Sequence, residues 1–367
     1  MLHHKEHTMI KLTYTLQLAS PAFLGDAAQK GVWRTPPLKA LIREWWRIAV
    51  ARELGYDHRR IKEREKALFG TAADDSRDGN QKSQIRLALA HWNEGCCKEW
   101  PAGESRVTHP EVKDRNTGRL RPVGSELYLG YGPLLLEKGN PNTQLKNNAA
   151  LQAGEDNQLR LALPPGAEAQ ALQRAITLAH WFGTIGGRSR NGWGSLLWQA
   201  ADGTPAPEAL SRTTLEQTGC TRALRDCLAL DWPHAIGSDT KGVLVWRSSQ
   251  TFKDWRSAMK FLAQTKIDFR THLDFTTGKN SPRVEPRHVL AYPVTNHSVG
   301  QWGNNARLAN TLRFKLHREG DGLRALIYHT PCKPTLPHGN LGLPGIFDTW
   351  QKVHRFLDDQ PTLTRLA

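Results

Sequence analysis

Alternating apolar and polar side chains mark several segments of the chain as strands. The pattern is regular in residues 10–18 ("IKLTYTLQL"), 84–92 ("QIRLALAHW") and 158–164 ("QLRLALP"), and it predicts strands with one buried face. Residues 195–198 ("SLLW") are apolar throughout and predict a buried strand, and residues 125–137 ("SELYLGYGPLLLE") suggest one more strand.

A three-to-four-residue period predicts two helices between these strands. In the segment from residue 36 to 55 the apolar side consists of Leu38, Leu41, Ile42, Trp45, Ile48 and Ala49. Lys39, Arg43 and Arg47 fall on the opposite side, with Trp46 at the border. The second helix covers residues 169–181. The order strand, helix, strands, helix, strand is that of a split βαβ, or ferredoxin-like, unit.

The second half of the chain follows a linker at residues 199–210, which is rich in Pro, Gly and Ala. It carries helix candidates near 211–229 and 251–263, a hairpin at 310–330 and a closing amphipathic helix at 347–359. Residues 298–309 ("SVGQWGNNARLA") weakly repeat a glycine-rich segment of the first half. We therefore expect an α+β protein with two ferredoxin-like (RRM-like) domains, residues 1–200 and a divergent domain at 201–367.

The net charge of the chain indicates what kind of partner it binds. Lys and Arg outnumber Asp and Glu by 50 to 35, a net charge of +15, which indicates a polyanionic partner such as nucleic acid. No apolar run of transmembrane length and no signal peptide are found, so a membrane partner is not expected. The five cysteines form no CxxC pair and no zinc spacing, which predicts a reduced, cytoplasmic protein without metal or cofactor.

Residues 183–198 ("GTIGGRSRNGWGSLLW") place five glycines beside two arginines and two tryptophans. The segment has no Gly-Lys-Ser/Thr, and it follows a helix and precedes a strand, so neither a Walker loop nor a Rossmann loop fits. Backbone amides and arginine forks together suit phosphate groups, and Trp193 offers a ring on which a base can stack. A tight turn between helix and strand without any ligand is the alternative.

Two separated motifs resemble known RNA-binding proteins. The segment "IGGRSRNGWGSL" resembles the glycine-rich loop of the RAMP superfamily, whose members belong to CRISPR effector complexes. Residues 19–47 resemble the N-terminal region of the first RAMP subunit of the type III-B (Cmr) complex. The matching positions are Pro21, Phe23, Gly25, Arg34, Pro36, Lys39, Arg43, Trp45, Trp46 and Arg47. Asp26 and Ala40 depart from the pattern, since glycine is usual at both.

The resemblance implies a non-catalytic RNA-binding subunit of a type III-B-like CRISPR ribonucleoprotein. Its partners are crRNA, target RNA and other RAMP subunits, with no small-molecule substrate, and it holds the crRNA 3′ region at the head end of the complex. The expected RNA-binding residues are Arg34, Lys39, Arg43, Trp46, Arg47, Gly186, Gly187, Arg188, Ser189, Arg190, Asn191, Gly192, Trp193 and Gly194.

An RNA endonuclease is the alternative function, because some RAMP relatives cut RNA. Cleavage without a metal needs a base for the 2′-hydroxyl and an acid for the leaving oxygen. Asp26 and His180 are the candidates for these roles. Capping of a loop by Asp26 and a structural position for His180 are the competing interpretations.

Overall fold

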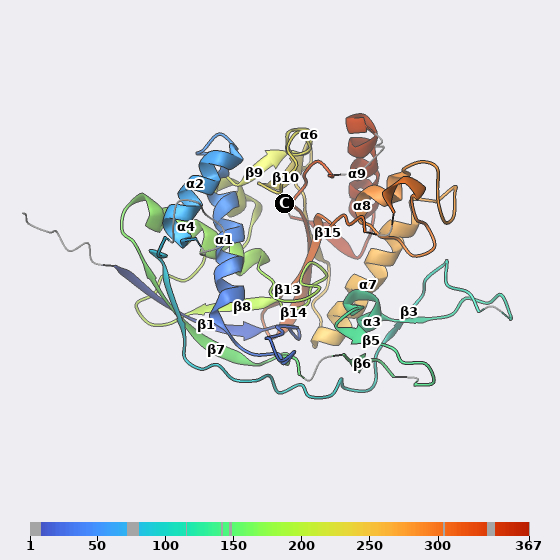
Figure 1. Cartoon of the computed structure of the whole chain (residues 1–367), viewed down its shortest axis with the longest axis horizontal. Helices are drawn as coiled ribbons and strands as arrows, with labels where there is room; N and C mark the ends of the chain where they lie inside the picture. Colours follow the sequence, from blue (N-terminus) through green and yellow to red (C-terminus); the bar gives the residue numbers. More distant parts are fainter. Residues whose placement is uncertain are drawn as a thin grey trace, which may run out of the picture. The chain divides into compact units, whose positions relative to one another are not determined.

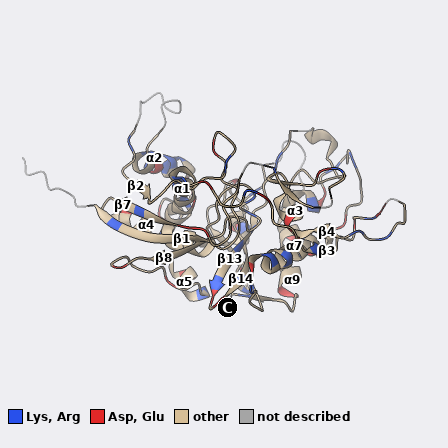
Figure 2. Cartoon of the chain, turned by 90° about the horizontal axis from the view of Figure 1, so that it is seen from below, with Lys and Arg blue, Asp and Glu red and all other residues tan. Residues whose placement is uncertain are grey.

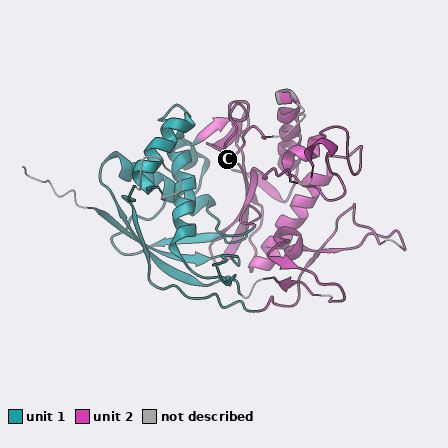
Figure 3. Ribbon diagram, in the orientation of Figure 1, with its two compact units in different colours: residues 1–98, 147–187, 193–220 teal, residues 99–146, 188–192, 221–367 magenta. Residues whose placement is uncertain are grey.

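The computed structural model describes residues 9–71, 81–114, 116–140, 142–146, 149–303, 305–335 and 342–366. The chain forms two compact units (Figure 3). Unit 1 comprises residues 1–98, 147–187 and 193–220, and unit 2 comprises 99–146, 188–192 and 221–367. The units therefore differ from the predicted division at residue 200, because 99–146 and 188–192 pack with the second half of the chain.

Unit 1 contains a four-stranded antiparallel sheet in the order β2-β7-β1-β8. Its strands and helices are β1 (Ile10–Leu18), α1 (Thr35–Ala51), α2 (His58–Phe69), β2 (Arg86–Leu89), β7 (Asp156–Leu163), α4 (Ala167–Phe182), β8 (Leu196–Ala200) and the short α5 (Arg212–Gln217). Helices α1 and α4 pack against each other and cover the sheet (Figure 1). Numbered 1 to 4 along the chain, the four strands lie side by side in the order 4-1-3-2, and each of the two crossover connections contains a helix. This is the predicted split βαβ arrangement.

Unit 2 repeats this topology. Its main sheet has the order β13-β14-β12-β15, again fully antiparallel. The elements in chain order are β12 (Val245–Ser248), α7 (Trp255–Thr271), α8 (Pro286–Leu290), the 3₁₀ turn η2 (Gly300–Trp302), β13 (Leu312–Glu319), β14 (Gly322–His329), α9 (Gly342–Asp358) and β15 (Leu363–Arg365). The predicted hairpin and the closing helix are confirmed, and the α+β class with two such units holds for the whole chain.

Shorter elements of unit 2 precede and flank this sheet. They are β3 (Arg106–Val107), β4 (Val123–Gly124), α3 (Ser125–Gly130), β5 (Leu134–Leu135), β6 (Gln144–Leu145), β9 (Thr221–Ala223), α6 (Leu224–Cys227), β10 (Ile236–Asp239) and β11 (Gly242–Val243). No helix within the described ranges is both long and apolar enough to span a bilayer.

The strand expected at 125–137 is wrong for its first half, which forms the helix α3. Two carboxylates account for the difference. The Glu104 side chain accepts a hydrogen bond from the Leu127 N–H at 2.7 Å and so caps the first turn of α3. The buried Glu126 carboxylate accepts from the Trp100 indole at 2.6 Å and pairs with Arg256 at 3.1 Å. Burial raises the pKa of Glu126 to about 7, and Arg256 opposes that shift.

The weak repeat at 298–309 is not the counterpart of the first glycine-rich segment. Residues 298–309 lie between α8 and β13, whereas the first segment connects α4 to β8, the last helix and last strand of its unit. The equivalent connection in unit 2 is 359–362, between α9 and β15, and it contains no glycine. The two units therefore share a topology but not this loop.

The glycine-rich loop is closed at its base by backbone contacts of unit 1. Thr184 and Ser195 form an isolated antiparallel bridge, and the Ile185 N–H donates to the Gly194 carbonyl at 2.9 Å. Gly194 has φ of 65°, and a β-carbon at this position would lie 2.0 Å from the Ile185 carbonyl oxygen. Both the left-handed backbone and the close approach require glycine here.

Gly194→Ala is therefore expected to destabilise unit 1 more than a matched glycine change. Gly203 is the control, because its φ is 76° but no atom lies within 4 Å of the β-carbon that alanine would add. Gly203→Ala should cost about 1–2 kcal/mol of unfolding free energy for the left-handed backbone alone. Gly194→Ala should cost about 1–3 kcal/mol more because of the overlap with Ile185. Urea unfolding of both variants measures the difference, and equal losses would show that the loop base is not tightly closed.

Candidate nucleic-acid interface

Residues 188–192 of the glycine-rich loop pack against β13, the edge strand of the main sheet in unit 2. The Phe314 N–H donates to the Arg190 carbonyl at 3.0 Å, and Asn191 forms a parallel bridge with Phe314. The backbone of this segment is thus fixed by an edge strand, while the Arg188 and Arg190 side chains are exposed. Both exposed arginines are residues that the sequence predicts to bind RNA.

The side-chain amide of Asn191 is used within the protein. Its Nδ2 donates to the Leu129 carbonyl of α3 at 2.7 Å, and its Oδ1 accepts from Lys266 Nζ of α7 at 2.8 Å. Asn191 therefore joins the loop to two helices. This arrangement assigns it a structural role in place of the predicted contact with RNA.

Lys266 brings a further positive charge to the loop. Burial lowers the pKa of Lys266 to about 7, and the neighbouring charges of Arg270 and Arg188 act in the same direction. Burial also lowers the pKa of Arg270. The Arg188 guanidinium lies beside Gly132, where an added β-carbon would be 3.4 Å from Nη2. The loop and α7 thus bring three cations close together. They are Arg188, Lys266 and Arg270, and we call them the three-cation cluster.

Sequence reasoning missed two members of this cluster. The helix prediction at 251–263 stopped before them, whereas α7 extends to Thr271. The four-residue spacing of Lys266 and Arg270 places both on one helix face, and this signal was present in the sequence. Figure 2 shows the basic residues along α7. Like charges held together in a half-buried site repel one another, so a bound phosphate group lowers the energy of the cluster.

Two tryptophans expected to face RNA are core residues of unit 1. Trp46 and Trp193 are 0% exposed. The Trp193 ring centroid lies 5.2 Å from that of Phe23, and the Trp46 ring contacts Phe69 edge-on at 5.6 Å. The base stacking predicted for Trp193 and the RNA contact predicted for the Trp46 ring do not fit this structure, because each large apolar surface is already covered by its own unit.

A different aromatic side chain is available beside the cluster. Tyr131 follows α3 and is 67% exposed. Its chain neighbour is Gly132, against which the Arg188 guanidinium lies. An exposed ring next to cations has the arrangement of a stacking platform for single-stranded nucleic acid.

Backbone amides of the loop contribute less than the sequence suggests. Four of them donate to protein carbonyls: Gly187 to Phe23, Asn191 to Arg188, Gly192 to Ser189 and Gly194 to Pro21. Gly192 and Gly194 are also buried, whereas Gly186 is exposed and Ser189 is half-buried. Gly186 and Arg188 carry the positive φ values of 89° and 57° that turn the chain. These four amides therefore hold the shape of the loop, and phosphate contacts at these positions fall to the side-chain cations.

The basic side of α1 forms an ion-pair network with α2 inside unit 1. Arg43 Nε and Arg47 Nη2 both donate to Glu65, at 2.9 and 2.7 Å. Lys39 Nζ donates to the Phe69 carbonyl at 2.8 Å, and an Arg34 guanidinium nitrogen donates to the Gly25 carbonyl. Glu65 offsets one of the two arginine charges. The stripe that the sequence predicts to bind RNA is thus partly neutralised by the protein.

Glu65 itself is held in the ionised form. Burial acts to raise its pKa, but the hydrogen bonds from Arg47 and Arg43 outweigh burial and leave the pKa below its ordinary value. Lys39 and Arg43 also line a cavity of about 440 Å³ beside Phe69. Burial and the nearby Arg43 charge lower the pKa of Lys39.

The two candidate catalytic residues of the endonuclease alternative have local structural positions. The Asp26 carboxylate accepts from the Lys30 N–H at 2.8 Å, and the Asp26 N–H donates to the Lys30 carbonyl at 2.9 Å. Asp26 thus closes a five-residue turn. His180 is half-buried in the last turn of α4. In the described part of the chain, no group of three or more His, Cys, Asp or Glu residues is arranged to hold a metal ion.

Glu65→Gln tests the network on α1 and α2. The unfolding free energy at neutral pH should fall by about 1.5–3 kcal/mol, because two charge-assisted hydrogen bonds weaken. Since the folded pKa of Glu65 is below its unfolded value, this contribution is complete at neutral pH and is lost as pH falls through the folded pKa. The difference between wild type and variant should therefore narrow on acidification. Glu63→Gln is the control on the same helix, since the Glu63 side chain is 71% exposed. If the difference in unfolding free energy between wild type and Glu65→Gln stays constant down to acid pH, the stabilising role of the ionised Glu65 is contradicted.

One protein family and several solved structures are similar to this chain. The family model of the RAMP superfamily matches residues 15–196, from β1 through the glycine-rich loop to the first residue of β8. Similar solved structures include apo Cmr1 from Pyrococcus furiosus, with 13% identity over 98% of this chain and 99% of that chain and a TM-score of 0.48. A chain of the type III-B Cmr-beta complex bound to cognate target RNA and AMPPnP has 10% identity over 96% of this chain and 100% of its own, with a TM-score of 0.47.

A chain of a type IV-B CRISPR complex aligns with 55% of this chain and 94% of its own, at 14% identity and a TM-score of 0.30. No curated protein sequence matches the chain. The family match includes the two motifs singled out from the sequence, at residues 19–47 and in the glycine-rich loop. The chain belongs to the RAMP superfamily.

Proposed function

We propose that this protein is an RNA-binding subunit of a type III-B-like CRISPR ribonucleoprotein, in which the three-cation cluster and Arg190 neutralise RNA phosphates. The observation that carries this proposal is the cluster itself. Arg188, from the loop, and Arg270, from α7, belong to the same unit as Lys266, and both lie close enough for their charges to oppose protonation of its ammonium group. The net charge of +15 and membership of the RAMP superfamily support a polyanionic RNA partner.

The finer assignment rests on the resemblance of residues 19–47 to the first RAMP subunit of the Cmr complex. On this basis we propose that the subunit lies at the head end, with the crRNA 3′ region and the target RNA. Contacts to phosphates carry no base information, so binding depends little on sequence. Tyr131 stacks on a base of the strand. The subunit acts without catalysis, since Asp26 is engaged in a turn.

The salt dependence of RNA binding tests the cluster directly. Removing one phosphate contact from a single-stranded complex should flatten the slope of log K against log salt by roughly 0.7. Arg188→Gln combined with Lys266→Gln should therefore reduce the slope by about 1.4, measured by fluorescence anisotropy with a labelled RNA at about pH 6. Glutamine keeps a donor for Asn191 at position 266, which protects the fold.

Lys260→Gln is the matched control for this measurement. Lys260 is exposed on the same helix, but its position is turned away from that of Lys266. The slope of log K against log salt in the control should differ from the wild-type slope by less than about 0.35, which is half the change expected for one phosphate contact. Wild-type affinity and slope in a folded double variant would rule out the cluster as a phosphate site.

The affinity for RNA should also depend on pH through Lys266. Its pKa of about 7 in the free protein means that the ammonium is partly neutral at physiological pH. RNA phosphates favour the charged form, so binding takes up a proton once the pH exceeds this pKa. The affinity should fall as the pH rises from about 6.5 to 8.5, by up to about tenfold per unit. Lys266→Gln should remove this dependence, whereas Arg188→Gln should keep it. An identical pH profile in wild type and Lys266→Gln would refute the assignment.

A further inference from the structure

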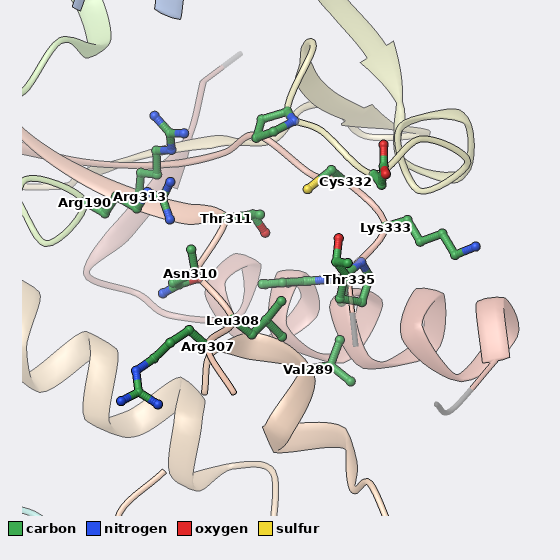
Figure 4. Close-up of a pocket in the computed structure, with 15 residues that line it drawn as sticks. Arg190, Val289, Arg307, Leu308, Asn310, Thr311, Arg313, Cys332, Lys333 and Thr335 are labelled. Atoms are coloured by element: carbon green, nitrogen blue, oxygen red, sulfur yellow. The ribbon is translucent and has the colours of Figure 1, made fainter. Parts of the chain in front are cut away.

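A cavity of about 230 Å³ lies within unit 2 at the beginning of β13. Figure 4 shows Arg190 and Arg313 together on one side of it, with Thr311 and Asn310 alongside. Arg190 comes from the glycine-rich loop and Arg313 from β13. The cavity therefore joins the loop segment at 188–192 to the main sheet of unit 2.

The lining is strongly cationic. Its charged members are Arg190, Arg307, Arg313 and Lys333 against the single carboxylate of Asp231. Lys333 and Arg307 are exposed, and both extend away from the other side chains in Figure 4, which leaves Arg190 and Arg313 near the cavity. Arg313 is only 6% exposed, so its guanidinium charge belongs to the wall and not to the open surface. A cationic wall that includes a buried guanidinium is stabilised by an anion.

The pKa of the Cys332 thiol depends in part on the arginines of the same wall. Burial raises the pKa of Cys332 to about 11, while the charges of Arg313 and Arg190 act in the opposite direction. Both guanidinium groups therefore lie within electrostatic reach of one sulfur atom. This convergence agrees with their placement side by side in Figure 4.

Apolar side chains form another part of the lining. Val289, Leu308, Pro334 and the indole of Trp350 contribute to it. Trp350 is almost completely buried, and its ring centroid lies 4.1 Å from that of His329, which fixes its orientation. An apolar side next to a cationic side matches a ligand that has a ribose or base attached to a phosphate.

The size of the cavity limits the ligand further. Its volume of about 230 Å³ is below the roughly 300–1,000 Å³ of ordinary small-molecule sites. A dinucleotide is therefore too large to enter. A phosphate with one ribose or base is the class of group that suits both the volume and the two kinds of wall.

We propose that this cavity receives one nucleotide of a bound RNA strand, with its phosphate against Arg190 and Arg313 and its ribose or base against Leu308 and Val289. The inference rests on the proposed function, because Arg190 shares the segment 188–192 with Arg188 of the three-cation cluster. The shared chemistry is that of a nucleoside monophosphate, free or within a strand, and the experiment separates these two sources.

The first measurement is calorimetric titration of the full chain with uridine 5′-monophosphate, uridine and inorganic phosphate. The monophosphate should bind at least about tenfold more tightly than either fragment, because only it meets both walls. Arg190→Gln and Leu308→Trp should each weaken its binding at least about tenfold. The first variant removes a charge, and the second fills the cavity from a half-buried position. Arg355→Gln is the control, since Arg355 is exposed on α9 outside the cavity, and it should bind like wild type.

Equal affinities for the monophosphate and its fragments would overturn the proposal, as would binding that Leu308→Trp leaves unchanged. Far-ultraviolet circular dichroism and thermal midpoints of all variants verify that unit 2 remains folded. Arg313 is left intact, because replacing a buried arginine risks the fold itself.

The second measurement is the affinity for a labelled single-stranded RNA of ten nucleotides. Leu308→Trp should weaken this binding at least about threefold while keeping the salt slope, because it removes no charge. If Leu308→Trp abolishes monophosphate binding but leaves RNA affinity unchanged, the cavity serves free nucleotides and the strand inference is overturned, while the proposed function stands. If wild type binds the monophosphate but no RNA, the proposed function fails, and the strand inference fails with it.

Discussion

The side-chain amide of Asn191 is the contact on which the candidate interface depends. One end donates to the Leu129 carbonyl of α3 and the other accepts from Lys266 of α7. The amide thus fixes the loop segment 188–192 against two helices and sets the position of the lysine at the same time. Without it, Lys266 would lose its hydrogen-bond acceptor within a group of like charges. A neutral amide is suited to this task, because a carboxylate would cancel the charge that a phosphate needs.

The two units show how one topology gives different surfaces. Helices α1 and α7 occupy equivalent places, each following the first strand of its split βαβ unit. Both carry cations at helical spacing. In unit 1, Arg43 and Arg47 share the buried carboxylate of Glu65 and form an internal network. In unit 2, Lys266 of α7 instead meets two further cations, Arg270 and Arg188, whose charges add to the burial that lowers its pKa.

The cavity at the start of β13 is the second place to which the glycine-rich loop supplies an arginine. Arg188 belongs to the three-cation cluster, and Arg190, two residues later, lines the cavity with Arg313. The loop carbonyl of Arg190 is held by the Phe314 N–H, so both arginines project from a backbone that an edge strand fixes. Glycines at the base, such as Gly194, allow the chain to reach this position. A short loop can in this way supply cations to two neighbouring sites.

The sequence by itself determined the four main strands of unit 1, the helices α1 and α4 and their split βαβ order, because these follow from apolar periodicity within short windows. It also determined the basic character of the chain and the place of the glycine-rich loop. Only the tertiary structure decided which cations stay available and which rings are covered. Lys266 meets Asn191 across 75 positions of the chain, and Trp193 is covered by Phe23 from a distant segment. Burial and charge pairing arise from such long-range neighbours, and periodicity within one helix or strand contains no record of them.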